Sequence, residues 1–335
     1  MVHSRLCRIK NVIINWCGGP IRSWGTKGKS PLNIQMLNPT SWHIEPTSRC
    51  TLECPGCDRT WYRNTFSKQI IQDIDVTALT NFFSVNNFLG SQIRLCGNNG
   101  DPIYHPKFIS LLESLKSQNH SVRIHTNASA KTEKFWQQVC DCLDHKDQIV
   151  FAIDGLKDTN HLYRKNSNWQ QIMMAVNTVV GCGINTEWQF IVFKQNQHQI
   201  QQAQTLSKQL GIKNFRVHKS HRWIDDSLDQ YMPDKEYVEE MYFDHQEIVD
   251  GVEAKGTMEP MCGMNRETFI DSNGNIFPCC WTATYRFQYK HAFGKQPINI
   301  AMGKYQLPQP HSDYIKSTQV WQTAPLVCRL HCAKY

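Results

Sequence analysis

From residue 42 onward, short apolar runs alternate along the chain with longer stretches of helical patterning. The short runs have the length of buried β-strands, and the longer stretches have the length and period of α-helices. The predicted strands are residues 42–45, 92–96, 122–126, 149–153, 188–193 and 215–218. The predicted helices are residues 76–86, 107–118, 132–143, 169–180 and 198–210. This alternation is typical of βα units around a parallel sheet.

Six predicted strands are too few to close an eight-stranded barrel. The pattern alone therefore leaves two α/β architectures open, a partial barrel and a doubly wound sheet. Residues 1–40, which precede the first strand, have little periodicity and several Gly and Pro breakers, so they are predicted to form an irregular arm.

Two further segments follow the βα region. Residues 225–253 contain 11 acidic residues and a single lysine, which is typical of a solvated linker or helix. Residues 256–335 are rich in Gly, Pro and aromatic residues and hold five cysteines, so this part needs a metal or a similar staple to fold. We therefore expect an arm (1–40), a main domain (41–224), an acidic connection (225–255) and a small C-terminal domain (256–335).

The composition bears on the compartment and on the use of cysteine. The chain has 335 residues, 14 cysteines and a formal net charge of +7. No apolar run reaches the roughly 18 residues of a membrane helix, and no apolar segment follows the first basic residues as in a secretory signal. We therefore expect a cytoplasmic protein without membrane contact, in which cysteines serve as metal ligands, reactive thiols or buried side chains.

The positive charge lies at the two ends of the chain. Residues 1–49 hold seven Lys and Arg against one acid, Glu45. A basic arm can contact nucleic acid or an acidic peptide. No run of five or six like charges occurs, which favours a solvated extension and disfavours a nucleic-acid partner.

Three cysteines follow the first predicted strand at a fixed spacing. Cys50, Cys54 and Cys57 form a C-x3-C-x2-C pattern with no evident fourth ligand nearby. Structural zinc sites use four ligands. Three thiolates suit a four-iron cluster that keeps one iron open for another ligand. Its position at the carboxyl end of a strand is where α/β folds bind ligands.

With this motif the sequence resembles the radical S-adenosylmethionine (SAM) superfamily over most of residues 42–335. Residues 96–102 read Cys-Gly-Asn-Asn-Gly-Asp-Pro in the place of the family's Gly-Gly-Glu-Pro motif, with a shorter acid and one glycine fewer. Thr126-Asn127 ends a predicted strand, residues 151–155 resemble the family's strand ending in Asp-Gly, and Tyr163-Arg164 matches its peptide-modifying branch. Gly56 stands where the family often has an aromatic residue before the last cysteine.

The resemblance implies a partial (β/α)6 TIM-like barrel and a reaction. Cys50, Cys54 and Cys57 would hold a [4Fe–4S] cluster whose open iron binds SAM, and reductive cleavage of SAM would give a 5′-deoxyadenosyl radical that takes a hydrogen atom from the substrate. The residues implied in binding SAM are Gly97, Asn99, Gly100, Asp101, Asn127 and Arg164. Among them Asp101 would accept from the SAM ammonium, Arg164 would pair with a carboxylate, and Asn127 would reach the ribose.

The C-terminal cysteines suggest a second cluster. Residues 269–277 read as a β-hairpin with a Gly-containing turn, between Cys262 and Cys279. With Cys328 and Cys332, this region resembles the SPASM/twitch extensions of radical SAM enzymes in their one-cluster form. The resemblance implies an auxiliary [4Fe–4S] cluster on Cys262, Cys279, Cys328 and Cys332, with Cys280 as the spare thiol. A zinc ribbon remains an alternative, as does exchange of Cys280 with Cys279.

The resemblance favours an enzyme that modifies a peptide or protein side chain and takes its electron from a reductant such as flavodoxin or ferredoxin. A radical SAM dehydrogenase of a sugar or cyclitol is the alternative, with a small-molecule substrate. A non-catalytic iron–sulfur or zinc protein that binds nucleic acid is a third interpretation, against which the open three-cysteine site argues. The sequence indicates no catalytic side chain.

Overall fold

The computed structural model describes residues 41–220, 226–238, 257–258, 267–277, 280–284, 299–301, 304–306 and 333–334. The predicted arm (1–40), most of the acidic connection and the proposed auxiliary ligands lie outside the described residues; these ligands are Cys262, Cys279, Cys328 and Cys332.

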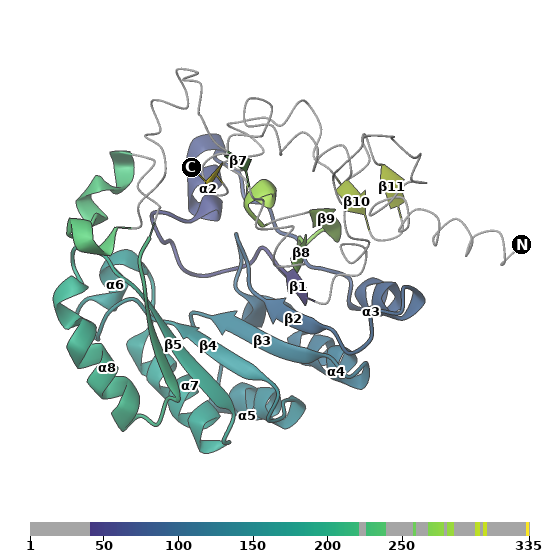
Figure 1. Ribbon diagram of the computed structural model, residues 1–335, viewed down its shortest axis with the longest axis horizontal. Coiled ribbons are helices and arrows are strands. Elements are labelled where there is room, and N and C mark those ends of the chain that lie inside the picture. Colours follow the sequence, from purple (N-terminus) through teal and green to yellow (C-terminus); the bar gives the residue numbers. More distant parts are fainter. Residues whose placement is uncertain are drawn as a thin grey trace, which may run out of the picture.

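Six parallel strands form the main sheet, and each predicted strand is present within one to three residues of its expected ends (Figure 1). The strands are β1 (Ser41–Ile44), β2 (Gln92–Leu95), β3 (Ser121–Thr126), β4 (Gln148–Ala152), β5 (Asn185–Ile191) and β6 (Asn214–His218). Their spatial order is the order of the chain, and every neighbouring pair is parallel. A doubly wound sheet reverses its winding direction once. This sheet winds in one direction, so the partial barrel is confirmed and the doubly wound alternative is wrong.

Helices connect the strands, and most of them cover one face of the sheet (Figure 1). They are α2 (Asp58–Phe66), α3 (Val76–Val85), α4 (Phe108–Ser117), α5 (Glu133–Cys142), α6 (Asn160–Tyr163), α7 (Trp169–Gly181) and α8 (Ile200–Gln209). Local signals begin several of them, because Asp75, Thr132 and Asn168 each accept a backbone N–H of the first turn. No helix of the described residues is long and apolar enough to cross a membrane.

The two faces of the sheet differ in chemistry. On the face under the helices, alternate residues such as Ile93, Ile124 and Trp188 are buried. Trp42 of β1 meets the ring edges of Phe82 and Phe83 of α3 at centroid distances of 5.5 and 5.3 Å. The intervening positions face the inside of the partial barrel and are largely polar. This inner face carries His43, Arg94, Arg123, His125, Glu187, Gln189, Arg216 and His218.

The predicted hairpin is present and extends the barrel sheet. β8 (Glu267–Ile270) pairs in parallel with β1, and β9 (Asn275–Phe277) returns antiparallel through a turn that ends at Gly274 with φ of +80°. Short strands β10 (Asn299–Ala301) and β11 (Lys304–Gln306) continue this edge. The hairpin is therefore attached to the strand that precedes the three-cysteine motif.

Candidate functional site

The three motif cysteines lie on the loop that leaves the carboxyl end of β1, and all three are half-buried. Cys50 Sγ accepts the backbone N–H of Leu52 at 3.4 Å and the side-chain amide of Asn127 at 3.6 Å. Cys57 is the residue before the first turn of α2, where the helix dipole favours negative charge. Burial, with the neighbouring Asp101, raises the pKa of the Cys50 thiol to about 12. Cys50 is therefore stabilised as a thiolate chiefly when a metal takes the place of its proton.

A buried arginine joins this loop to the next one. Arg59 of α2 is 5% exposed, and its Nε donates to the Asn99 carbonyl at 3.1 Å. A second guanidinium nitrogen donates to the Leu52 carbonyl within the cysteine loop. The Arg59 side chain thus fixes the cysteine loop against residues 97–101.

Glu45, which directly follows β1, holds the loop at residues 97–101 by hydrogen bonds to its backbone. Its Oε1 accepts the backbone N–H groups of Asn99 at 2.6 Å and Gly100 at 3.0 Å, and its Oε2 accepts the Asn99 side-chain amide at 3.2 Å. Burial raises the pKa of Glu45 to about 7, although these N–H donors oppose the shift. The carboxyl group acts as a clamp on the backbone that the sequence assigned to SAM binding.

The two glycines of this loop are required by the packing of the loops themselves. A Cβ on Gly100 would lie 1.9 Å from the Thr47 carbonyl oxygen, and one on Gly97 would lie 2.1 Å from the Gly100 oxygen. Distances below 3.0 Å are essentially never found for real Cβ atoms. The close approach at Gly100 is therefore made by the chain's own backbone after β1.

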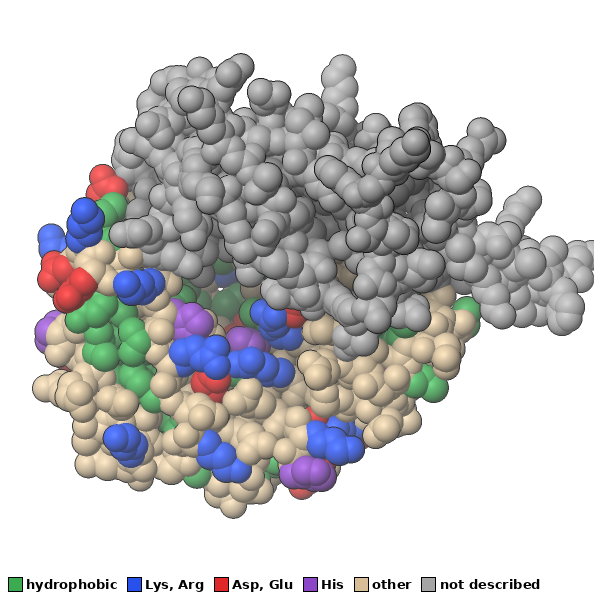
Figure 2. Space-filling view, viewed as in Figure 1, with side chains coloured by type: hydrophobic (Ala, Val, Ile, Leu, Met, Phe, Trp, Pro, Cys, Tyr) green, Lys and Arg blue, Asp and Glu red, His purple; other side chains and the backbone are tan. Residues whose placement is uncertain are grey.

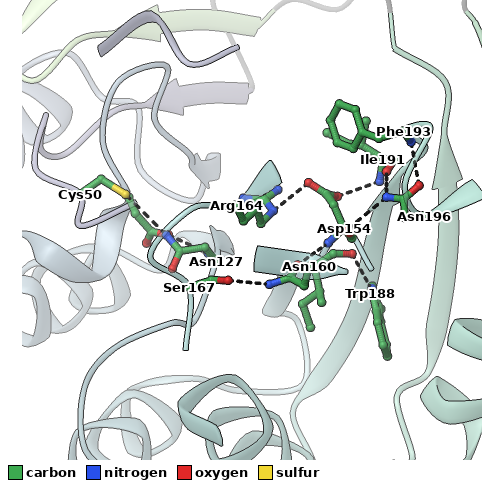
Figure 3. A network of polar contacts seen from close by, with 12 residues as sticks. Cys50, Asn127, Asp154, Asn160, Arg164, Ser167, Trp188, Ile191, Phe193 and Asn196 are labelled. Carbon is green, nitrogen blue, oxygen red and sulfur yellow. Dashed lines mark hydrogen bonds and ion pairs between the residues drawn. The ribbon is translucent and has the colours of Figure 1, made fainter. Parts of the chain in front are cut away.

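Asp101 and Asn127 form one hydrogen-bonded unit. Asp101 Oδ2 accepts the Asn127 backbone N–H at 2.6 Å, its side-chain amide at 2.5 Å and the Thr126 hydroxyl at 3.1 Å. Burial raises the pKa of Asp101 to about 6. The sequence assigned Asp101 to the SAM ammonium and Asn127 to the ribose. In the structure Asp101 positions Asn127, whose amide also reaches Cys50 (Figure 3).

Arg164 points toward Asp154, and Asn127 lies between Arg164 and Cys50 (Figure 3). Arg164 Nε and Asp154 Oδ2 are 2.7 Å apart, and Asp154 Oδ1 accepts the backbone N–H of Ile191 at 2.8 Å. Burial acts to lower the pKa of Arg164, but the negative charges of Asp154 and Cys54 raise it overall. Arg164 therefore lies near Cys54, and its ion pair with Asp154 connects it to the loop after β4 and to β5.

The structure brings together the six residues assigned to SAM and the three cysteines at the carboxyl ends of β1 to β4. Sequence reasoning missed three groups that hold them, Glu45, Arg59 and Asp154. Glu45 ends the first predicted strand and Asp154 belongs to the quoted Asp-Gly sequence, so their positions were visible. Arg59 had no sequence signal, because its partners are backbone carbonyls of two different loops.

The donor set fits an iron–sulfur cluster. Among the described residues no three His, Cys, Asp or Glu side chains converge closely enough to hold a single metal ion. A [4Fe–4S] cluster needs no such convergence, because each cysteine binds a different iron and the sulfurs surround the cluster. The N–H groups of Leu52 and Asn127 at Cys50 Sγ are the donors that commonly stabilise cluster thiolates.

No protein-family model and no curated protein matches the chain. Among solved structures it is similar to Streptococcus suis SuiB bound to the precursor peptide SuiA, with 13% sequence identity and a TM-score of 0.56 over 98% of this chain and 82% of that chain. It is also similar to anSMEcpe with bound AdoMet and a Cp18Cys peptide, with 14% identity and a TM-score of 0.51 over 84% and 83% of the two chains. Both are radical SAM enzymes. The resemblance seen in the sequence is thus confirmed at the level of architecture: the chain has the radical SAM fold.

Proposed function

We propose that the protein is a radical SAM enzyme that takes a hydrogen atom from a peptide or protein side chain. The observation that carries this proposal is the three-cysteine loop at the carboxyl ends of the strands of a radical SAM fold, with backbone and amide N–H groups directed at Cys50. When bound on Cys50, Cys54 and Cys57, a reduced [4Fe–4S] cluster would supply the electron that cleaves SAM.

The chain's own residues position and shield this chemistry. Arg59 and Glu45 keep the loop at residues 97–101 against the cysteine loop, so that the two loops present a fixed surface. Asp101 orients the Asn127 amide toward Cys50. Arg164, held by Asp154, places a positive charge beside Cys54. Positive charge and N–H donors near the thiolates favour the reduced, more negative form of a cluster.

The peptide substrate is supported by the two neighbours, which were solved with a precursor peptide and with a Cp18Cys peptide. The auxiliary cluster on Cys262, Cys279, Cys328 and Cys332 belongs to the same proposal. The hairpin that precedes Cys279 is part of the barrel sheet, and the Asn98 side chain donates to the Cys280 carbonyl at 2.7 Å. β7 (Thr257–Met258) pairs with β12 (Ala333–Lys334), which joins the chain before Cys262 to the chain after Cys332.

Anaerobic reconstitution followed by incubation with dithionite or reduced flavodoxin and SAM tests the proposal. We expect release of 5′-deoxyadenosine by the wild type and none by Cys54→Ala. The control is Cys182→Ala, because Cys182 is an exposed thiol at the end of α7, away from the loop. Iron-loaded wild type that releases no 5′-deoxyadenosine would overturn the proposed activity, as would equal release by the Cys54 variant.

A further inference from the structure

The inner face of the partial barrel carries a group of charged side chains that the site described above does not use. His43, Arg94 and Arg123 are register partners on β1, β2 and β3. Arg216 is on β6, at the far side of the sheet. Lys, Arg and His side chains gather in the middle of the face shown in Figure 2, over the strands seen in Figure 1. We call Arg94, Arg123, Arg216 and the two carboxylates that they contact the inner-face cluster.

The positive charge of this cluster exceeds the negative charge. Arg94 pairs with Glu267, and Arg123 and Arg216 share Glu187 at 3.1 and 3.4 Å. Three guanidinium groups are thus matched by two carboxylates among the described inner-face residues. Both carboxylates are already engaged, so one unit of positive charge remains for another anion.

The neighbouring histidines do not balance this charge, and their pKa values are lowered in part by it. Burial first, and then the positive charge of Arg94, lower the pKa of His43 to about 3. Burial, Arg123 and Arg94 lower the pKa of His125 to about 3 in the same way. Both imidazoles are therefore neutral at physiological pH. The two histidines lie in a field that favours negative charge on an incoming group.

Buried polar atoms of the cluster and of the two neighbouring histidines lack protein partners within the described part of the chain. They are Arg123 Nε, His43 Nδ1 and His125 Nε2. Because His43 Nε2 donates to the Cys96 carbonyl at 2.8 Å, its Nδ1 is an acceptor in the neutral ring. Arg123 thus offers a charged donor, while His43, which is 5% exposed and is the register partner of Arg94 on the adjacent strand, offers an acceptor. Buried atoms of this kind are normally satisfied, so they point to a ligand with both types of group.

The inner face also has the right location for a substrate. The His43–Cys96 hydrogen bond connects it to the residue before Gly97, at the start of the proposed SAM loop. The guanidinium groups remain accessible, with side-chain exposures of 40% for Arg94, 37% for Arg123 and 57% for Arg216. A group held here would lie along the strands that carry the site at their carboxyl ends.

We propose that the inner-face cluster binds a carboxylate of the substrate with an N–H or O–H donor next to it, such as an acidic residue of a peptide. The inference rests on the proposed function in that it takes the bound molecule to be the substrate. Guanidinium groups recognise carboxylates by paired N–H donors, and the neutral histidines accept from the adjacent donor. A sugar acid presents the same chemistry and is distinguished by the probes below.

The test measures the rate at which an arginine-specific dicarbonyl reagent modifies each arginine of the reconstituted enzyme, by peptide mass spectrometry. The probes are acetyl-Gly-Glu-Gly-amide with its glutamine counterpart, and D-glucuronate with D-glucose. Arg49 and Arg63 are internal controls, since they have similar exposures of 42% and 34% and are also ion-paired. We expect a carboxylate probe to slow modification of Arg94, Arg123 and Arg216 several-fold, while its neutral counterpart does not and the two control arginines are unaffected.

A charge-balanced variant sharpens the test. The double variant Arg123→Gln with Glu187→Gln removes an ion pair without changing the net charge, and it should abolish the protection of Arg94 and Arg216.

The outcomes distinguish the two sources of the carboxylate. Protection by the peptide alone indicates a peptide substrate, and protection by glucuronate alone indicates a sugar acid. No protection by either carboxylate, equal protection of all five arginines, or persistent protection in the double variant overturns the inference. The 5′-deoxyadenosine assay on the same preparation decides the proposed function separately, because footprinting requires no turnover.

Discussion

At the scale of single residues, the site depends on backbone loops packed too closely to admit a side chain. Gly100 is the sharpest case, with the Thr47 carbonyl oxygen 1.9 Å from the position of an added Cβ. We predict that Gly100→Ala lowers the free energy of unfolding by about 2–4 kcal/mol, as expected when a buried loop must shift. Gly181→Ala is the matched control: at the end of α7 it meets no atom within 4 Å, and alanine favours helix by about 0.5–1 kcal/mol. Denaturant unfolding of both variants checks the pair, and an equal effect contradicts the packing argument.

Glu45 gives a prediction for pH. Its pKa rises from 4.5 to about 7 in the folded protein, chiefly through burial. Between these pH values the folded state holds a proton that the unfolded chain has released, so the contribution of Glu45 to stability falls as pH rises. Glu45→Gln removes this fall. Relative to the wild type, the variant should gain on the order of 3 kcal/mol between pH 5 and pH 8.

The measurement for Glu45 is the difference in melting temperature between variant and wild type at several pH values. His43 and His125, whose pKa values are lowered to about 3, contribute the opposite slope below pH 6.5. They are present in both proteins and cancel in the difference. A difference that does not change with pH would show that Glu45 is ionised throughout.

Candidate ligand residues of this site can be identified from the sequence where the signal is local. Cys50, Cys54 and Cys57 are close in sequence, and their spacing alone indicates a cluster. The hydrogen bonds of Asp101 with Thr126 and of Arg59 with Asn99 were not predictable, because these partners lie 25 and 40 residues away. The assignment of Asp101 to the SAM ammonium stays a prediction. A sequence pattern identifies the residue type that a site needs, but not whether that residue meets the cofactor or supports the residue that does.

At the scale of elements, the strands and helices followed the prediction because their signals are short-range: apolar runs, helix caps and Gly or Pro breakers. The polar inner face was missed although its residues alternate with buried ones along β2, β3 and β5. The short strands were interpreted as wholly apolar runs. Alternation of polar and buried residues was visible in β3, where Arg123 and His125 are two positions apart. Only the register of adjacent strands shows that the polar residues of several strands form one surface.

At the amino ends of the strands, away from the candidate site, a buried ion pair joins α4 to the sheet. Lys116 of α4 pairs with two carboxylates, Asp147 at 2.7 Å and Asp144 at 3.0 Å. Asp147 is fully buried and also accepts the backbone N–H of Val122 at the start of β3. We predict that Asp147→Ala destabilises by about 3–5 kcal/mol, because it leaves the buried Val122 N–H without its acceptor and removes the buried partner of Lys116.

The control is Asp144→Ala, which removes a 46%-exposed partner of the same lysine and should cost at most about 1 kcal/mol. Both values come from denaturant unfolding of the purified variants. Similar costs for the two variants would mean that the lysine, rather than the buried carboxylate, holds α4 to β3.

At the scale of the whole molecule, the C-terminal hairpin and the barrel share one sheet. β8 continues the barrel beyond β1 in parallel, so the hairpin turn before the proposed auxiliary ligand Cys279 lies at the carboxyl ends of the strands, as the three-cysteine loop does. The sequence placed residues 256–335 in a separate small domain, since a hairpin between cysteines carries no information about which strand it joins. The pairing of β8 with β1 links residues more than 220 positions apart, which no local pattern records.

This arrangement separates the roles of two adjacent thiols, Cys279 and Cys280. Cys280 contacts the barrel through its backbone carbonyl, which accepts from Asn98 at 2.7 Å, and Cys280→Ala keeps that group. We therefore predict that Cys280→Ala retains about eight irons per chain after anaerobic reconstitution, as expected for two [4Fe–4S] clusters. Cys279→Ala should retain about four, held by the motif cysteines, and should still release 5′-deoxyadenosine. The reason is that Glu45 and Arg59, rather than the auxiliary site, fix the loop proposed to bind SAM. Iron, sulfide and zinc analysis of each variant checks this prediction. Full iron loading in Cys279→Ala would exchange the roles of the two thiols. About four irons with one zinc in the wild type would mean that a zinc ribbon takes the place of the auxiliary cluster.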